Sequence, residues 1–187
     1  MLQRVAAPLA QAIGSLWRKG SITAAHEHFA SALLRTYLAQ AARPFAAGAN
    51  EPVLAVATPA GQLHELGALL AAAMAANLGW HVTYLGAGLP APEIAGAVRQ
   101  NQARAVAISL VYPPDDPQME GELTRLRDLL PPEVRLIVGG HAMPAYREAL
   151  EKIAAIQAKD LTHLCLILDE LRPPARFIRR AVGLPRP

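Results

Sequence analysis

A histidine stands in a loop between two apolar segments. His64 lies in the stretch TPAGQLHELG, after the short run 53–57 and before a long Ala/Leu-rich run. The first run predicts a buried strand and the second a buried helix. In open α/β sheets, the loops at the carboxyl ends of strands bind ligands. An imidazole at this place can give one ring nitrogen to a metal while a neighbour such as Gln62 orients the other.

Two later loops carry small residues that permit close approach to a ligand. Ser109 and Leu110 end or follow the apolar run 105–109, and the pair Gly139–Gly140 follows the run 135–138. A double glycine lets the backbone come close to a flat or bulky group. The serine hydroxyl can donate a hydrogen bond to a ligand or satisfy a local backbone group. Taken alone, each motif is equally typical of an ordinary turn.

The remaining metal-ligating side chains restrict the kind of metal that His64 could bind. No set of His, Cys and carboxylate residues has the spacing of a zinc site. A metal held by His64 must therefore arrive inside a cofactor. Cys165 is the only cysteine, so it can form no internal disulfide, and its apolar neighbours predict a buried thiol.

Apolar segments that alternate between strand and helix patterns position these loops. Five β/α units in a row predict a flavodoxin-like parallel α/β sheet in the order 2-1-3-4-5. That order places the loops after strands one, three and four side by side. The expected strands are 53–57, 81–84, 105–109, 135–138 and 153–157, and the expected helices are 65–78, 91–101, 118–130, 144–151 and 160–171.

The three loop motifs, taken together and in this order, resemble the cobalamin-binding domain family over residues 52–171. In that family a histidine replaces the dimethylbenzimidazole base of cobalamin as the lower axial ligand of cobalt. The displaced nucleotide tail lies in a slot beside a serine and a glycine pair. The resemblance implies that His64 is the cobalt ligand. The other cofactor-binding positions that it implies in this domain are Gln62, Gly67, Ser109, Leu110, Gly139 and Gly140.

One position departs from the family pattern. Gln62 stands where the family has Asp or Glu. A carboxylate would accept a hydrogen bond from the histidine and strengthen it as a ligand, whereas an amide oxygen accepts without charge. We expect a weaker bond between cobalt and His64 as a result.

Two amphipathic helices, 3–16 and 21–43, precede the sheet, with Ser21 or Thr23 as the N-cap of the second and Pro44 at its end. They carry the spacing Trp17, nine residues, Glu27 and His28. This pattern is similar to the helical cap of the adenosylcobalamin-dependent light-sensing transcription regulators. The resemblance implies that Trp17, Glu27 and His28 surround the adenosyl group. On spacing alone, the same residues fit a helix-packing tryptophan with two solvated polar neighbours.

Further departures from that family concern the upper face of the corrin ring. Arg18 stands where those photoreceptors have a second cobalt-binding histidine, so His26 or His28 would have to supply the nitrogen after photolysis. The family cap has four helices and follows a DNA-binding domain, and this chain matches only the second half of the cap. We therefore expect no direct sequence-specific DNA binding. Apolar stripes of the two helices predict a homodimer through the cap, or a separate regulator protein on the same surface.

Composition completes the expectations. The apolar stretches are shorter than a membrane helix needs and the N-terminus is a poor signal peptide, which predicts a cytoplasmic protein. The sequence divides into a cap (1–47), a cobalamin-binding domain (52–171) and a basic Pro/Arg-rich tail (172–187). The net charge is +3, and the tail holds five arginines without an acid, so the rest carries 3 − 5 = −2.

Three functions remain open from the sequence. The first is an adenosylcobalamin photoreceptor module without enzyme activity, and the second is the corrinoid carrier of a methyltransferase system. The third is a relative that binds haem or a bilin in the same cleft. A nicotinamide site at Gly86–Ala91 fits the pattern G-x-G-x-x-A. It follows the second strand rather than the first, which disfavours it.

Overall fold

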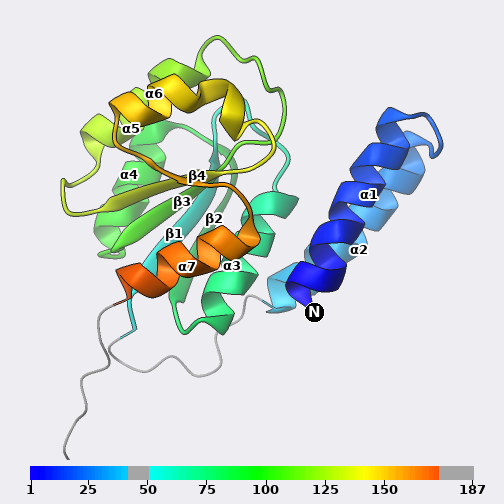
Figure 1. The fold of residues 1–187 in the computed structure, drawn as a ribbon, viewed down its shortest axis with the longest axis horizontal. Coiled ribbons are helices and arrows are strands. Elements are labelled where there is room, and N and C mark those ends of the chain that lie inside the picture. Colours follow the sequence, from blue (N-terminus) through cyan, green and yellow to red (C-terminus); the bar gives the residue numbers. More distant parts are fainter. Residues whose placement is uncertain (42–50, 173–187) are drawn as a thin grey trace, which may run out of the picture.

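Residues 1–41 and 51–172 are described by the computed structural model. Five parallel strands form one sheet in the order β2-β1-β3-β4-β5, which confirms the predicted order (Figure 1). A helix follows each strand and returns the chain to the starting edge of the sheet, so successive strands run parallel. The strands are β1 (Val53–Pro59), β2 (His81–Leu89), β3 (Ala105–Ser109), β4 (Arg135–Gly139) and β5 (Ile156–Ala158).

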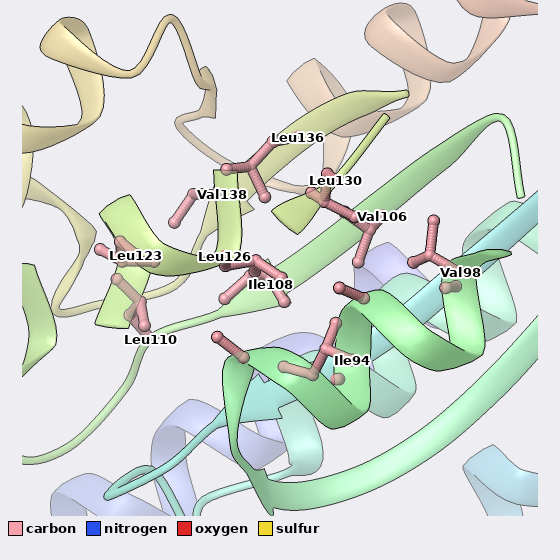
Figure 2. Packing of buried hydrophobic residues seen from close by; sticks show 14 of the residues in the cluster. Ile94, Val98, Val106, Ile108, Leu110, Leu123, Leu126, Leu130, Leu136 and Val138 are labelled. Carbon is pink, nitrogen blue, oxygen red and sulfur yellow. The ribbon is translucent and has the colours of Figure 1, made fainter. Parts of the chain in front are cut away.

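Helices cover both faces of the sheet. On one face α4 (Ala91–Gln100), α5 (Met119–Leu129) and α6 (Arg147–Lys152) share a core with alternate strand residues such as Val106 and Ile108. Figure 2 shows the side chains of α4 and α5 in this core. On the other face α3 (Leu66–Asn77) and α7 (Leu161–Leu171) pack on the intervening residues. Apolar side chains on both sides of each central strand are the reason that these strands read as continuous apolar runs.

Several element boundaries differ from the sequence expectation. The fifth strand begins at Ile156 rather than Ile153, because Ala154 has a positive φ of 52° and residues 153–155 turn after α6. Ile153 is apolar because it packs on the α4–α6 side of the core, not because it lies in the sheet. The second strand extends to Leu89, so the stretch GAGL belongs to β2. A short 3-10 helix, η2 (Met143–Tyr146), precedes α6.

The N-terminal residues form a helical hairpin. It consists of a π-helical segment η1 (Leu2–Ala6), α1 (Ala7–Arg18) and α2 (Ala24–Ala41). Thr23 is the N-cap of α2, since its Oγ1 accepts from the His26 N–H at 3.3 Å. Residues 42–50, with Pro44 and most of the predicted linker, and residues 173–187 of the predicted tail lie outside the described residues.

The hairpin packs on α3 and leaves part of its apolar surface exposed. Leu2, Ile13, Leu34 and Leu38 form one cluster with Leu69, Leu70 and Ala73 of α3. The predicted stripes are therefore split between two environments. Exposed fractions of 39% to 68% are found for Val5, Leu9, Leu16, Phe29, Leu33 and Tyr37. No helix within residues 1–41 and 51–172 combines the length and apolar composition needed to cross a membrane.

The single cysteine is only half-buried, which corrects the expectation of a buried thiol. Cys165 lies on α7, and its Sγ accepts a long hydrogen bond of 3.8 Å from Gln3 of the hairpin. Burial raises the pKa of the Cys165 thiol, and the carboxylates of Asp169 and Asp160 raise it further. The thiol is therefore held in its neutral form.

Candidate functional site

His64 lies in the loop between β1 and α3, at the carboxyl end of the sheet. Its side chain is exposed, and its ring meets the Tyr112 ring edge to face, with centroids 5.7 Å apart and planes at 86°. Among residues 1–41 and 51–172 no side chain forms a hydrogen bond with the imidazole. Both ring nitrogens are thus available to a ligand, and one of them can bind a metal ion.

Gln62 holds the neighbouring loop rather than the imidazole. Its side chain is fully buried, and its Oε1 accepts from the backbone N–H of Val111 at 2.7 Å and of Tyr112 at 2.9 Å. Its Nε2 donates to the Pro113 carbonyl at 2.9 Å. The sequence suggested Gln62 as the group that orients His64. In the structure its side-chain amide instead forms hydrogen bonds with the backbone of the loop after β3.

The serine and glycine motifs converge on the same edge of the sheet. Ser109 pairs with Gly139 in the β3–β4 register and is 7% exposed. A Cβ built on Gly67 would lie 2.7 Å from the Ser109 Oγ, and one built on Gly139 would lie 3.1 Å from the Ala158 carbonyl oxygen. A side chain at either position would clash with these neighbours, so glycine lets α3, β3, β4 and β5 pack closely at this edge.

Leu110 and Gly140 fix the backbone beside this edge. The Leu110 N–H donates to the Gly139 carbonyl at 2.9 Å, and the Leu110 carbonyl accepts from the Ala142 N–H at 3.0 Å. Gly140 has a φ of +103°, a conformation that favours glycine. Leu110 itself is fully buried, so it supports the group formed by Gly67, Ser109 and Gly139, here called the cradle, and presents no side chain to a ligand.

Three residues that the sequence analysis missed support the His64 loop. Thr58 is fully buried, and its hydroxyl donates to the Gln62 carbonyl and accepts from the Gly88 N–H at 3.0 Å. Glu65 accepts from the Tyr84 hydroxyl at 2.6 Å. Burial, followed by this bond to Glu65, raises the pKa of Tyr84, so the phenol remains a donor. No spacing signal marks these residues, because each depends on contacts between separate elements.

Glu65 also connects this loop to the hairpin. Its Oε1 lies 2.6 Å from the Nε of Arg35 on α2. The Arg35 side chain is 55% exposed while that of Glu65 is 18% exposed, so solvent weakens the pair without removing it. The residue next to His64 is in this way bonded to both the hairpin and β2.

The predicted upper-face residues lie at the turn end of the hairpin. Trp17 is near the end of α1 and 44% exposed. Glu27, in the first turn of α2, accepts from the Ser31 hydroxyl at 2.6 Å and pairs with His28 at 2.8 Å. The His26 ring lies 3.1 Å from the Thr23 hydroxyl at the helix start. Within residues 1–41 and 51–172, no hydrogen bond, ion pair or ring contact joins these residues to His64.

Surface hollows lie beside the site rather than on it. One of about 470 Å³ lies between α5 and α6 and is lined by charged residues such as Glu120, Arg125 and Lys152. Another of about 100 Å³ adjoins the β1–α3 loop at Gly61 and Asp116. His64 lines neither of these two hollows.

These features fit a metal that is carried by a larger organic ligand. In the described part of the chain, no group of three or more His, Cys, Asp or Glu side chains is placed to hold a metal ion. A single exposed imidazole at the carboxyl end of the sheet would suit a metal that a macrocycle already holds by its other positions. The chemistry of the donor set is therefore compatible with cobalamin.

Solved structures are similar to this chain in fold. A cobalamin-binding protein from Desulfitobacterium hafniense DCB-2 is similar with a TM-score of 0.57 and 18% identity, over 91% of this chain and 82% of that one. The monomethylamine corrinoid protein of Methanosarcina barkeri gives a TM-score of 0.60 and 16% identity, over 87% and 78% of the two chains.

Sequence comparison gives closer similarity. The HTH-type transcriptional repressor CarH of Myxococcus xanthus is 33% identical over 150 residues, which is 80% of this chain and 50% of that protein. CarA of the same organism is 32% identical over 149 residues, or 79% and 51%. The chain thus spans about half the length of these curated relatives. Residues 52–160, which contain His64 and the glycine cradle, match the B12 binding domain model, and the chain belongs to that family.

Proposed function

We propose that the protein is a cobalamin-dependent sensory module that uses adenosylcobalamin and acts through protein–protein contacts. The observation that carries the proposal is the exposed His64 imidazole beside the cradle of Gly67, Ser109 and Gly139. When bound, adenosylcobalamin supplies a cobalt–carbon bond that light can break. His64 would bind the metal of the cofactor, and Ser109 with the glycines beside it would contact the nucleotide tail.

An absorption experiment tests this proposal. The purified protein is loaded with adenosylcobalamin in the dark, and its spectrum and mass are recorded before and after green light. A light-dependent spectrum accompanied by a change in assembly supports the sensory function. A light-independent assembly, together with methyl transfer from protein-bound methylcobalamin to an added thiolate, catalysed by a corrinoid methyltransferase and leaving cob(I)alamin, would instead support the carrier function.

The first site prediction concerns Trp17. Trp17→Ala should weaken adenosylcobalamin binding by about 1 to 3 kcal/mol, because the adenosyl group would lose an aromatic side chain against which to pack. Methylcobalamin lacks the adenosyl group, so its Kd should remain unchanged. The measurement is a titration of both cofactors with wild type, Trp17→Ala and the control Phe29→Ala, which removes another exposed aromatic of the hairpin. Equal losses for both cofactors would remove Trp17 from the upper face.

We further propose that the hairpin forms a homodimer. Val5 is exposed on η1, Leu9 and Leu16 are exposed on α1, and Phe29, Leu33 and Tyr37 are exposed on α2. An exposed apolar surface of this kind usually marks an interface. A two-fold axis would cover it with the same surface of a second copy and leave no open end.

The second site prediction tests this dimer. Leu9→Glu should convert the dimer to a monomer of 19.9 kDa, because each subunit would bring an unpaired carboxylate into the interface. Gln11→Glu adds the same charge to an exposed position on another side of α1 and should leave the dimer intact. Light-scattering mass at micromolar concentration gives the result. A wild-type monomer with bound cobalamin would contradict the proposal.

A further inference from the structure

The loop after β3 is built around the amide of Gln62. Its oxygen accepts from the N–H groups of Val111 and Tyr112, and its nitrogen donates to the Pro113 carbonyl. An amide satisfies all three backbone groups at once. A carboxylate has no donor and would place a second oxygen against the Pro113 carbonyl. The glutamine is therefore matched to this loop, and its side chain is fully buried there.

This arrangement fixes the backbone of Tyr112 beside His64. Tyr112 is bonded through its own N–H to Gln62, while its ring is 61% exposed and lies edge to face with the imidazole at 5.7 Å. The exposure of the ring means that burial in the core does not account for an aromatic residue at this place. The contact with His64 gives a reason for an aromatic residue here, since the edge-to-face arrangement of two aromatic rings is attractive.

We propose that Tyr112 is a positioning residue that orients the His64 imidazole toward cobalt by ring packing. Gln62 serves this by holding the Tyr112 backbone. The inference rests on the proposed cobalamin function. It assigns to an aromatic contact the orienting role that a hydrogen-bonding neighbour has at many metal-bound histidines.

The contact can be measured first in the protein without cofactor. The carbon-bound protons of the His64 ring should show a ring-current shift in wild type and in Tyr112→Phe, which keeps the ring. Tyr112→Leu keeps an apolar side chain without a ring, and the shift should disappear. Because Tyr112 is largely exposed, both variants should fold. Identical His64 signals in wild type and Tyr112→Leu would overturn the inference.

The effect on ligation is measured with cob(II)alamin and protein labelled with ¹⁵N-histidine. Electron paramagnetic resonance then distinguishes a protein nitrogen on cobalt from the ¹⁴N of dimethylbenzimidazole. Tyr112→Leu should lower the ratio of histidine-ligated to unligated cobalt about two- to tenfold, and Tyr112→Phe should restore it. An unchanged ratio in Tyr112→Leu would overturn the positioning role.

The role of Gln62 has its own variant. Gln62→Glu keeps the acceptor for Val111 and Tyr112 but loses the bond to Pro113, so the His64 proton signals should move in the same direction as in Tyr112→Leu. If the His64 proton signals do not move in Gln62→Glu, Gln62 does not help to hold Tyr112 against His64. If wild type shows no ¹⁵N splitting at all, the proposed cobalt ligand is wrong, whereas splitting that is insensitive to Tyr112 refutes only this inference.

Discussion

A His64→Ala variant should bind cobalamin without a protein nitrogen on cobalt. Loss of a partner that merely orients a ligand typically weakens metal binding 10- to 100-fold, so loss of the ligand itself should cost about 100-fold or more in Kd. Cofactor that remains bound should show the spectrum of cobalamin with dimethylbenzimidazole or water below the metal. The measurement is a cofactor titration combined with the absorption spectrum.

The matched control for this variant is His81→Ala. His81 is also exposed, but it opens β2 at the amino end of the sheet, away from the loops that carry the motifs. Its replacement should leave both the Kd and the spectrum unchanged. A wild-type spectrum in His64→Ala would refute the assignment of the cobalt ligand, and equal changes in both variants would point to a general effect on folding.

Gly140→Ala should destabilise the fold by about 2 to 5 kcal/mol. A Cβ at this position would lie 2.9 Å from the backbone nitrogen and carbonyl carbon of Leu110 and closer still to its oxygen. The φ of +103° is in addition strained for any residue with a side chain. Leu110 cannot retreat easily, because its carbonyl is bonded to Ala142. Urea unfolding without cofactor gives the free energy of unfolding.

A second glycine provides the control for this experiment. Gly96 lies within α4, and a Cβ there would meet nothing within 4 Å. Gly96→Ala should therefore stabilise the protein by about 0.5 to 1 kcal/mol through helix propensity. Gly140→Ala with wild-type stability would show that the β4–η2 turn relaxes freely, and the turn could not then act as a rigid part of the cradle.

The fold and the convergence of the motifs were predictable because they depend on local patterns. Each strand and helix of the sheet carries its own apolar signal, and the 2-1-3-4-5 order then brings Ser109 beside Gly139. The partners of Gln62 were not predictable, since they lie 49 to 51 positions away in the chain. The same holds for Tyr112, whose packing on His64 depends on how two loops approach each other.

The hairpin illustrates another limit of sequence patterns. Leu9 and Ile13 are neighbours on α1, yet Ile13 is 7% exposed and Leu9 is 48% exposed. A helical stripe indicates which side of a helix is apolar, but not how much of that side a given neighbour covers. Ile13 belongs to the cluster that the hairpin forms with α3, and Leu9 does not.

The pair between Arg35 and Glu65 makes the hairpin and the His64 loop thermodynamically linked. Glu65 is bonded to α2 and to Tyr84 while it stands next to His64 in the chain. The Arg35–Glu65 pair forms only when the hairpin is docked and the loop is ordered, so each of these two events favours the other. Such coupling is reciprocal: whatever factor a docked hairpin adds to the affinity of the loop for a ligand, the ligand must add to the docking of the hairpin.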